Sequence, residues 1–88
     1  MRAVVTVVGS DKIGIVAGIT ASLEELKANI VDISQTILGD NFTMMMMVEV
    51  PENANFTTFK ENLVQKGENL GVTVHVQNQA IFDAMHKL

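Results

Sequence analysis

The stretch FTMMMMVEV, which ends just before Pro51, contains four consecutive methionines. Side chains alternate between the two faces of a strand, so Met44 and Met46 share one face while Met45 and Met47 lie on the other. A short apolar run of this kind is consistent with a strand that is covered on both sides. The run therefore predicts a central strand that ends at the proline, and it excludes a soft-metal site in which all the thioethers converge.

The rest of the chain alternates between strand-like and helix-like patterns. The strand-like segments are rich in β-branched residues or alternate apolar with polar ones, and they are residues 2–8, 30–38 and 72–77 in addition to the methionine run. Helical spacing begins at Ile13 or Gly14, and it recurs after residue 55. Its apolar positions are Ile15, Ile19, Leu23 and Leu26 in the first helix, and Phe56, Phe59, Leu63 and Leu70 in the second.

This β-α-β-β-α-β order predicts an α+β, ferredoxin-like fold over residues 1–78. Right-handed crossovers give a four-stranded antiparallel sheet of order 4-1-3-2, with two helices on one face. The edge strands then alternate apolar with polar residues, and the central strands are apolar on both faces. Residues 79–88 are expected to form a short helical tail, with an apolar stripe at Ile81, Phe82, Met85 and Leu88.

Local signals mark the ends of these elements. Asp11 is the expected N-cap of the first helix, and Asn29 is the expected left-handed residue at its end. The sequence GDN at residues 39–41 is typical of a hairpin turn, and Gly71 is expected to close the second helix.

Composition limits the possible functions. The 88 residues carry a formal charge of −4 and no cysteine. The charge disfavours nucleic acid and anionic lipid as partners, and the missing thiols exclude a cysteine nucleophile and a thiolate metal site. The first residues make a poor signal peptide, and no apolar run is long enough to span a bilayer, so a cytoplasmic location is expected. No cofactor is expected.

The core of so short a chain is small, and a partner is expected to add to it. The sheet face that bears Met45 and Met47 is the one that a two-layer domain leaves open. The C-terminal helix, a second subunit or both are expected to cover it. A homodimer or higher oligomer is therefore predicted.

The loop GSDKIG, between the first strand and the first helix, carries the candidate site. The start of a helix offers unpaired N–H groups to a carboxylate or phosphate. Lys12 adds a positive charge, Asp11 offers an acceptor for an amino group, and Gly14 lets a ligand approach the backbone at Ile13 and Gly14. On spacing alone, a simple cap, a tight turn and a solvated lysine explain the same residues.

The segments VVGSDKIGIVAGIT and ANIVDISQ resemble the ACT domain, a small regulatory module that binds amino acids. Asp11 and Gly14 match the family's first loop, in which Lys12 stands at a variable position and Ile13 replaces the usual proline. Asn29 and Ile30 match the Asn-Ile pair that follows the first helix. The short chain is similar to stand-alone ACT proteins related to the glycine cleavage system transcriptional repressor.

The resemblance implies a ligand site built from Asp11, Lys12, Ile13, Gly14, Asn29 and Ile30. It also implies that the Asn meets the ligand, an amino acid or related carboxylate, across a subunit interface. The chain would then pass a signal to a regulated enzyme or regulator protein. Gly9 stands where the family often has a polar ligand contact.

Other functions of this fold fit less well. An RNA-recognition domain needs stacking aromatics on its central strands, where only Phe42 occurs. An acylphosphatase-like enzyme needs an arginine in the first loop, whereas Arg2 starts the first strand. His75 and His86 are isolated, and no metal site or catalytic set is expected. A protein–protein interaction module that binds no ligand remains open.

Overall fold

The computed structural model describes residues 1–10 and 14–85. Its elements in chain order are β1 (Arg2–Gly9), α1 (Ile15–Glu25), β2 (Asn29–Leu38), β3 (Asn41–Glu49), α2 (Phe56–Leu70), β4 (Thr73–Asn78) and α3 (Gln79–Met85). All strand pairs are antiparallel, and the sheet order is β2-β3-β1-β4. The predicted α+β fold and strand order are confirmed.

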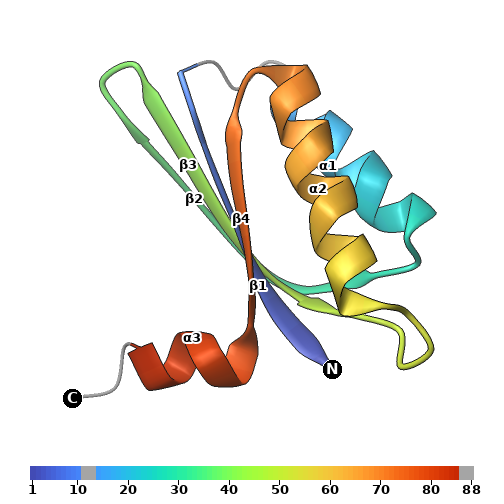
Figure 1. Ribbon diagram of the computed structural model, residues 1–88. Coiled ribbons are helices and arrows are strands. Elements are labelled where there is room, and N and C mark those ends of the chain that lie inside the picture. Colours follow the sequence, from blue (N-terminus) through green and yellow to red (C-terminus); the bar gives the residue numbers. More distant parts are fainter. Residues whose placement is uncertain (11–13, 86–88) are drawn as a thin grey trace.

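The core lies between the sheet and the pair formed by α1 and α2, which cover the same face (Figure 1). Met44 and Met46 are 0% and 1% exposed, as the alternation of the methionine run predicted. They pack in one cluster with Ile19 of α1 and with Phe59 of α2. Full burial of each of these side chains contributes about 1.5–3 kcal/mol, so this cluster is the main source of stability.

The opposite face of the sheet is only partly covered. α3 leaves the end of β4 on the side away from α1 and α2, and it contacts β1 and β4 (Figure 1). Val4, which belongs to this face, is 3% exposed, but Met45 is 41% exposed. A single chain therefore leaves part of an apolar sheet face in contact with solvent, as the sequence predicted.

Two predicted chain reversals are confirmed. Gly39 has φ +62° in the turn that joins Leu38 to its partner Asn41, as expected for the GDN hairpin. Gly71 has φ +76° and closes α2. At the start of α2, the Asn55 side chain accepts a hydrogen bond from the Thr58 N–H at 3.0 Å, which is a typical N-cap.

The prediction for the end of α1 was wrong. The left-handed residue is Lys27, with φ 59°, and Asn29 is the first residue of β2. The Ala28 N–H donates to the Leu23 carbonyl oxygen at 2.9 Å, which is the long bond of a Schellman motif. The helix has to end this early because Ile30 pairs with Val48 in the sheet.

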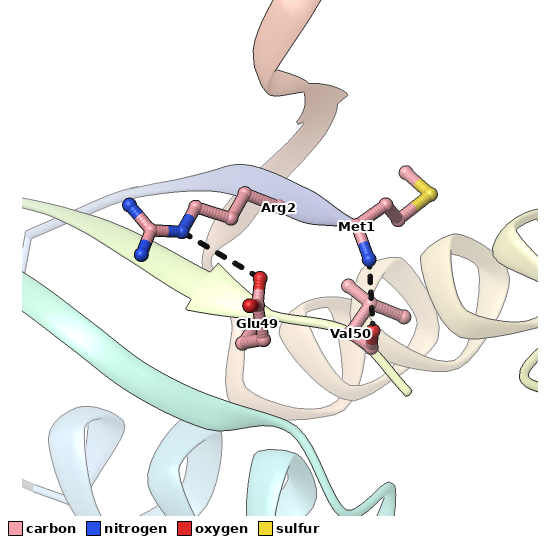
Figure 2. Close-up of polar contacts among 4 residues, drawn as sticks. All are labelled: Met1, Arg2, Glu49 and Val50. Carbon is pink, nitrogen blue, oxygen red and sulfur yellow. Dashed lines mark hydrogen bonds and ion pairs between the residues drawn. The ribbon is translucent and has the colours of Figure 1, made fainter. Parts of the chain in front are cut away.

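The N-terminus extends the β1–β3 ladder by one further pair (Figure 2). The Met1 ammonium donates to the Val50 carbonyl oxygen at 3.2 Å, and the Val50 N–H donates to the Met1 oxygen at 2.7 Å. Beside this pair, Arg2 Nε lies 3.6 Å from Glu49 Oε2. Both of these side chains are about half exposed, so the ion pair adds little stability and the backbone bonds fix this end of the sheet.

In the part of the chain that the structure describes, no helix has the length and apolar character needed to span a membrane.

Candidate functional site

The first backbone donors of α1 have no partner among the residues that the structure describes. Gly14 is the N-cap residue, and the first bond of the helix runs from the Gly18 N–H to the Gly14 oxygen at 2.8 Å. Gly14 has no side chain to cap this end, and no other side chain within residues 1–10 and 14–85 caps it. The N–H groups of residues 15–17 precede that bond, so they point out of the helix at its positive pole. This arrangement can hold a carboxylate.

The prediction of the capping residue at this helix start was wrong. Asp11 is not the N-cap, because the cap is Gly14 and the helix begins at Ile15. The described donors at this helix start are those of Ile15 and the two residues after it. The ligand contact at the N–H groups of Ile13 and Gly14 stays a prediction. Asp11, Lys12 and Ile13 themselves lie outside the described residues.

Gly14 is open to solvent and has a left-handed backbone. Its φ is +79°, a conformation that side chains other than glycine rarely adopt. A Cβ built at this position would meet no atom of the described residues within 4 Å. Space for a ligand therefore exists beside Gly14, and the backbone conformation alone explains the glycine.

Gly9 has a packing role at the base of the same loop. A Cβ at Gly9 would lie 2.5 Å from Val72 Cγ1 and 3.4 Å from Ile15 Cδ1. The end of β1 is thus held tightly against the segment that leads into β4 and against the first residue of α1. This contact accounts for the glycine at a position where the ACT family often carries a polar ligand contact.

Asn29 and Ile30 lie at the other end of the sheet. Asn29 pairs with Glu49, which pairs with Arg2 at the start of β1, whereas the loop follows Gly9 at the end of β1. At about 3.3 Å per residue, the length of β1 separates the two ends by roughly 23 Å. One chain therefore does not bring Asn29 to the loop. The Asn29 side chain is exposed, and Ile30 is partly buried against the core.

Sequence reasoning did not foresee the state of the β2 edge. Every residue of β2 other than Ile30 is exposed. Ile33 and Ile37 point to the helix side yet remain 41% and 56% exposed. The alternation of apolar and polar residues predicts an edge strand here. It does not predict how much of the strand's apolar face the helices cover.

Comparison with known proteins gives one consistent result. The ACT domain family model matches residues 2–77. The UPF0237 protein YjhC of Lactococcus lactis is 66% identical over 88 residues, which is the full length of both chains. The solved ACT domain protein from Streptococcus pneumoniae is 46% identical, with a TM-score of 0.86 over 94% of each chain.

A more distant solved structure, named as a glycine cleavage system transcriptional repressor, is 24% identical with a TM-score of 0.76. It covers 86% of this chain and 44% of its own, and it shows a shared fold. The matching strand order and the extent of these likenesses lead to one conclusion: the chain belongs to the ACT domain family.

Proposed function

We propose that this protein is a homodimeric regulatory module that binds a free amino acid or a related small carboxylate. The observation that carries the proposal is the start of α1, which no described side chain caps, beside the exposed Gly14. The ligand carboxylate would accept hydrogen bonds from the N–H groups of residues 15–17. Lys12 would add positive charge, and Asp11 or a backbone carbonyl would accept from the ligand's amino group.

Asn29 would complete the site from the second subunit. Since Asn29 and the loop lie at opposite ends of one sheet, only a neighbouring chain in the reverse orientation can bring them together. An antiparallel pairing of the two β2 edges has this orientation. It moves the partner's Asn29 and the partner's Ile30 to the end of the sheet that holds Gly14.

The β2 edge supports such a pairing. A pairing centred on Gln35 sets Ile33 opposite the partner's Ile37, so the exposed apolar residues of the helix side would cover one another. The β2 sequence contains no lysine or proline, two residues that commonly prevent an edge strand from pairing with another chain. The Ile33 N–H now donates to its neighbour Asp32 at 2.9 Å, and pairing would replace that bond.

A ligand held between two subunits couples binding to assembly. Ligand would tighten the dimer, and dimerisation would tighten ligand binding by the same factor. This linkage is how the module would signal to an enzyme or regulator protein that distinguishes the liganded dimer.

The test is a thermal-shift panel of the twenty amino acids, followed by calorimetry on any that raise the melting temperature. At about 100 times its dissociation constant, a ligand stabilises by roughly 2.7 kcal/mol, which in a domain of this size is about 10–20 °C. Asn29→Ala should abolish that shift, and Asn62→Ala, an exposed asparagine on α2, should retain it. A panel with no shift at all would contradict amino acid binding and favour the interaction module that binds no ligand.

A further inference from the structure

The open face of the sheet has a hollow in it. The hollow has a volume of about 140 Å³, and its lining includes Val4, Met45 and Met47, with Asp32 and Ser34 from β2 at its side. The register confirms that these residues share a face, since Met47 pairs with Val4 and Asp32, and Met45 pairs with Ser34. An apolar cavity of about 150 Å³ holds a benzene-sized group, so this hollow can take one branched aliphatic side chain.

α3 carries such a side chain on the same side of the sheet. Ile81 is 58% exposed, although α3 itself contacts β1 and β4. More than half of its side chain is therefore accessible to a second molecule. Asp83 and Ala84 are also exposed. The same side of the molecule thus presents both an apolar projection and an apolar hollow.

We infer that a second copy of this chain covers the open face, with the Ile81 side chain of each copy inserted into the hollow of the other. A surface that contains both halves of a contact is self-complementary, as a two-fold interface requires. α3 stands out from the sheet at this end (Figure 1). It keeps two such sheets from meeting directly at the usual spacing of about 10 Å, so the partner's α3 is the element that reaches the hollow.

The size and polarity of the face suit an interface between two copies. A specific interface needs at least about 600 Å² from each chain. The chain measures 36 × 35 × 19 Å, so a partner that covers about half of its broad face meets this requirement. Val4, Met45 and Met47 of the central strands lie in the middle of the face, together with Thr6. Ser34 on β2 and His75 on β4 form a polar rim at the two edges, which is the usual anatomy of an interface.

This contact goes beyond the proposed function and uses a different surface from the β2 edge. A chain with both contacts forms a tetramer, in which each β2-paired dimer meets another through α3. The two contacts can be removed separately, so the failure of one is distinguishable from the failure of the other.

The experiment is sedimentation of the full chain at micromolar concentrations, with charges added on either side of the contact. Ile81→Glu and Met45→Lys should each raise the dissociation constant of the α3 contact about tenfold or more. Ala21→Glu, which adds the same charge on the exposed side of α1, should leave assembly unchanged. The double variant Ile81→Glu with Met45→Lys should recover most of the lost affinity, because the two charges then attract across the contact.

Circular dichroism of each variant checks that the fold is retained, and Ile81→Ser repeats the test without a charge. Parent tetramers that become dimers support the α3 contact. Parent dimers that become monomers also support it, and they contradict the β2 contact. Variants that assemble as the parent does, or a double variant no stronger than the single ones, would overturn the inference.

Discussion

Gly67 of α2 lies so close to Val74 of β4 that a methyl group at Gly67 would overlap the Val74 side chain. The Val72 carbonyl oxygen would also lie only 3.2 Å from that methyl group, so the backbone limits any relaxation. The absence of a side chain at Gly67 therefore sets how closely α2 packs on the sheet.

Gly67→Ala should destabilise the protein although alanine is the better helix former. The helix propensity gain is about 1 kcal/mol, and overpacking costs about 1–3 kcal/mol. We expect a net loss near 1 kcal/mol, which lowers the melting temperature by roughly 4–8 °C. The neighbouring exposed substitution Glu68→Ala should change stability by less than about 0.5 kcal/mol. A Gly67→Ala variant that melts higher than the parent would show that α2 can move away from β4 at little cost.

Lys27→Gly should stabilise the protein. Lys27 adopts φ 59° at the end of α1, and a left-handed conformation costs a residue with a Cβ about 1–2 kcal/mol. Glycine avoids that cost but loses more conformational entropy on folding, so the expected gain is about 0.5–1 kcal/mol. The matched change Lys60→Gly, in the interior of α2, should destabilise by about 1 kcal/mol. Chemical denaturation measures the free energy of unfolding of both variants. If both substitutions stabilise the protein, or both destabilise it, the left-handed conformation of Lys27 does not carry the expected cost.

The sequence predicted the strand order and the burial of the methionines because the patterns of several strands and helices all fit the same sheet topology. Met44 and Met46 had to face the helices if Met45 and Met47 did not, and the order of elements allowed one sheet topology. Such predictions rest on periodicity, which survives errors of a residue or two at any boundary.

The ends of α1 were predicted wrongly because capping preferences are local and weaker than packing. Asp11 is a favourable cap by residue type, yet the helix begins where Ile15 packs into the core. Asn29 is a favourable left-handed residue, yet β2 needs it extended beside Glu49. The separation of Asn29 from the loop follows from the strand topology, so the sequence could have predicted it. Whether a second chain completes the site depends on the exposure of the β2 edge, which the sequence alone does not give.

Ile37→Lys should weaken the β2-paired dimer. Ile37 is more than half exposed on the free edge, so its replacement should alter the stability of one chain by less than about 0.5 kcal/mol. A lysine on an edge strand opposes pairing with another strand. In the two-fold pairing this lysine would lie beside the second chain, so the dissociation constant of the β2-paired dimer should rise about tenfold or more. Thr57→Lys, exposed on α2, is the control. Unchanged sedimentation of Ile37→Lys would exclude the β2 edge as the contact.

Peroxide should oxidise Met45 before Met44 and Met46. A thioether gains one oxygen atom from the peroxide and water is released, and the rate follows access to the sulfur. In a single chain Met45 is exposed on the open face, whereas Met44 and Met46 are buried, so Met45 becomes accessible whenever the α3 contact dissociates. Peptide mass spectrometry of the intact fold should show this order, and Ile81→Glu should speed oxidation at Met45 by removing the partner's α3. Equal rates at Met44 and Met45 would mean that the strand does not hold its alternation in solution.

The central claim is that one ligand site draws on two chains, and mixing two defective variants tests it. Gly14→Val blocks the approach to the loop, and Asn29→Ala removes the amide, so neither should bind the amino acid identified in the thermal-shift panel. In the mixed dimer, the loop of the Asn29→Ala chain meets the intact Asn29 of the Gly14→Val chain. A refolded equal mixture should therefore recover about one quarter of the parental binding capacity by calorimetry, since half of the dimers are mixed and each holds one intact site. If the mixture binds no more ligand than the separate variants do, or if either variant alone binds as the parent does, the two-chain site is wrong.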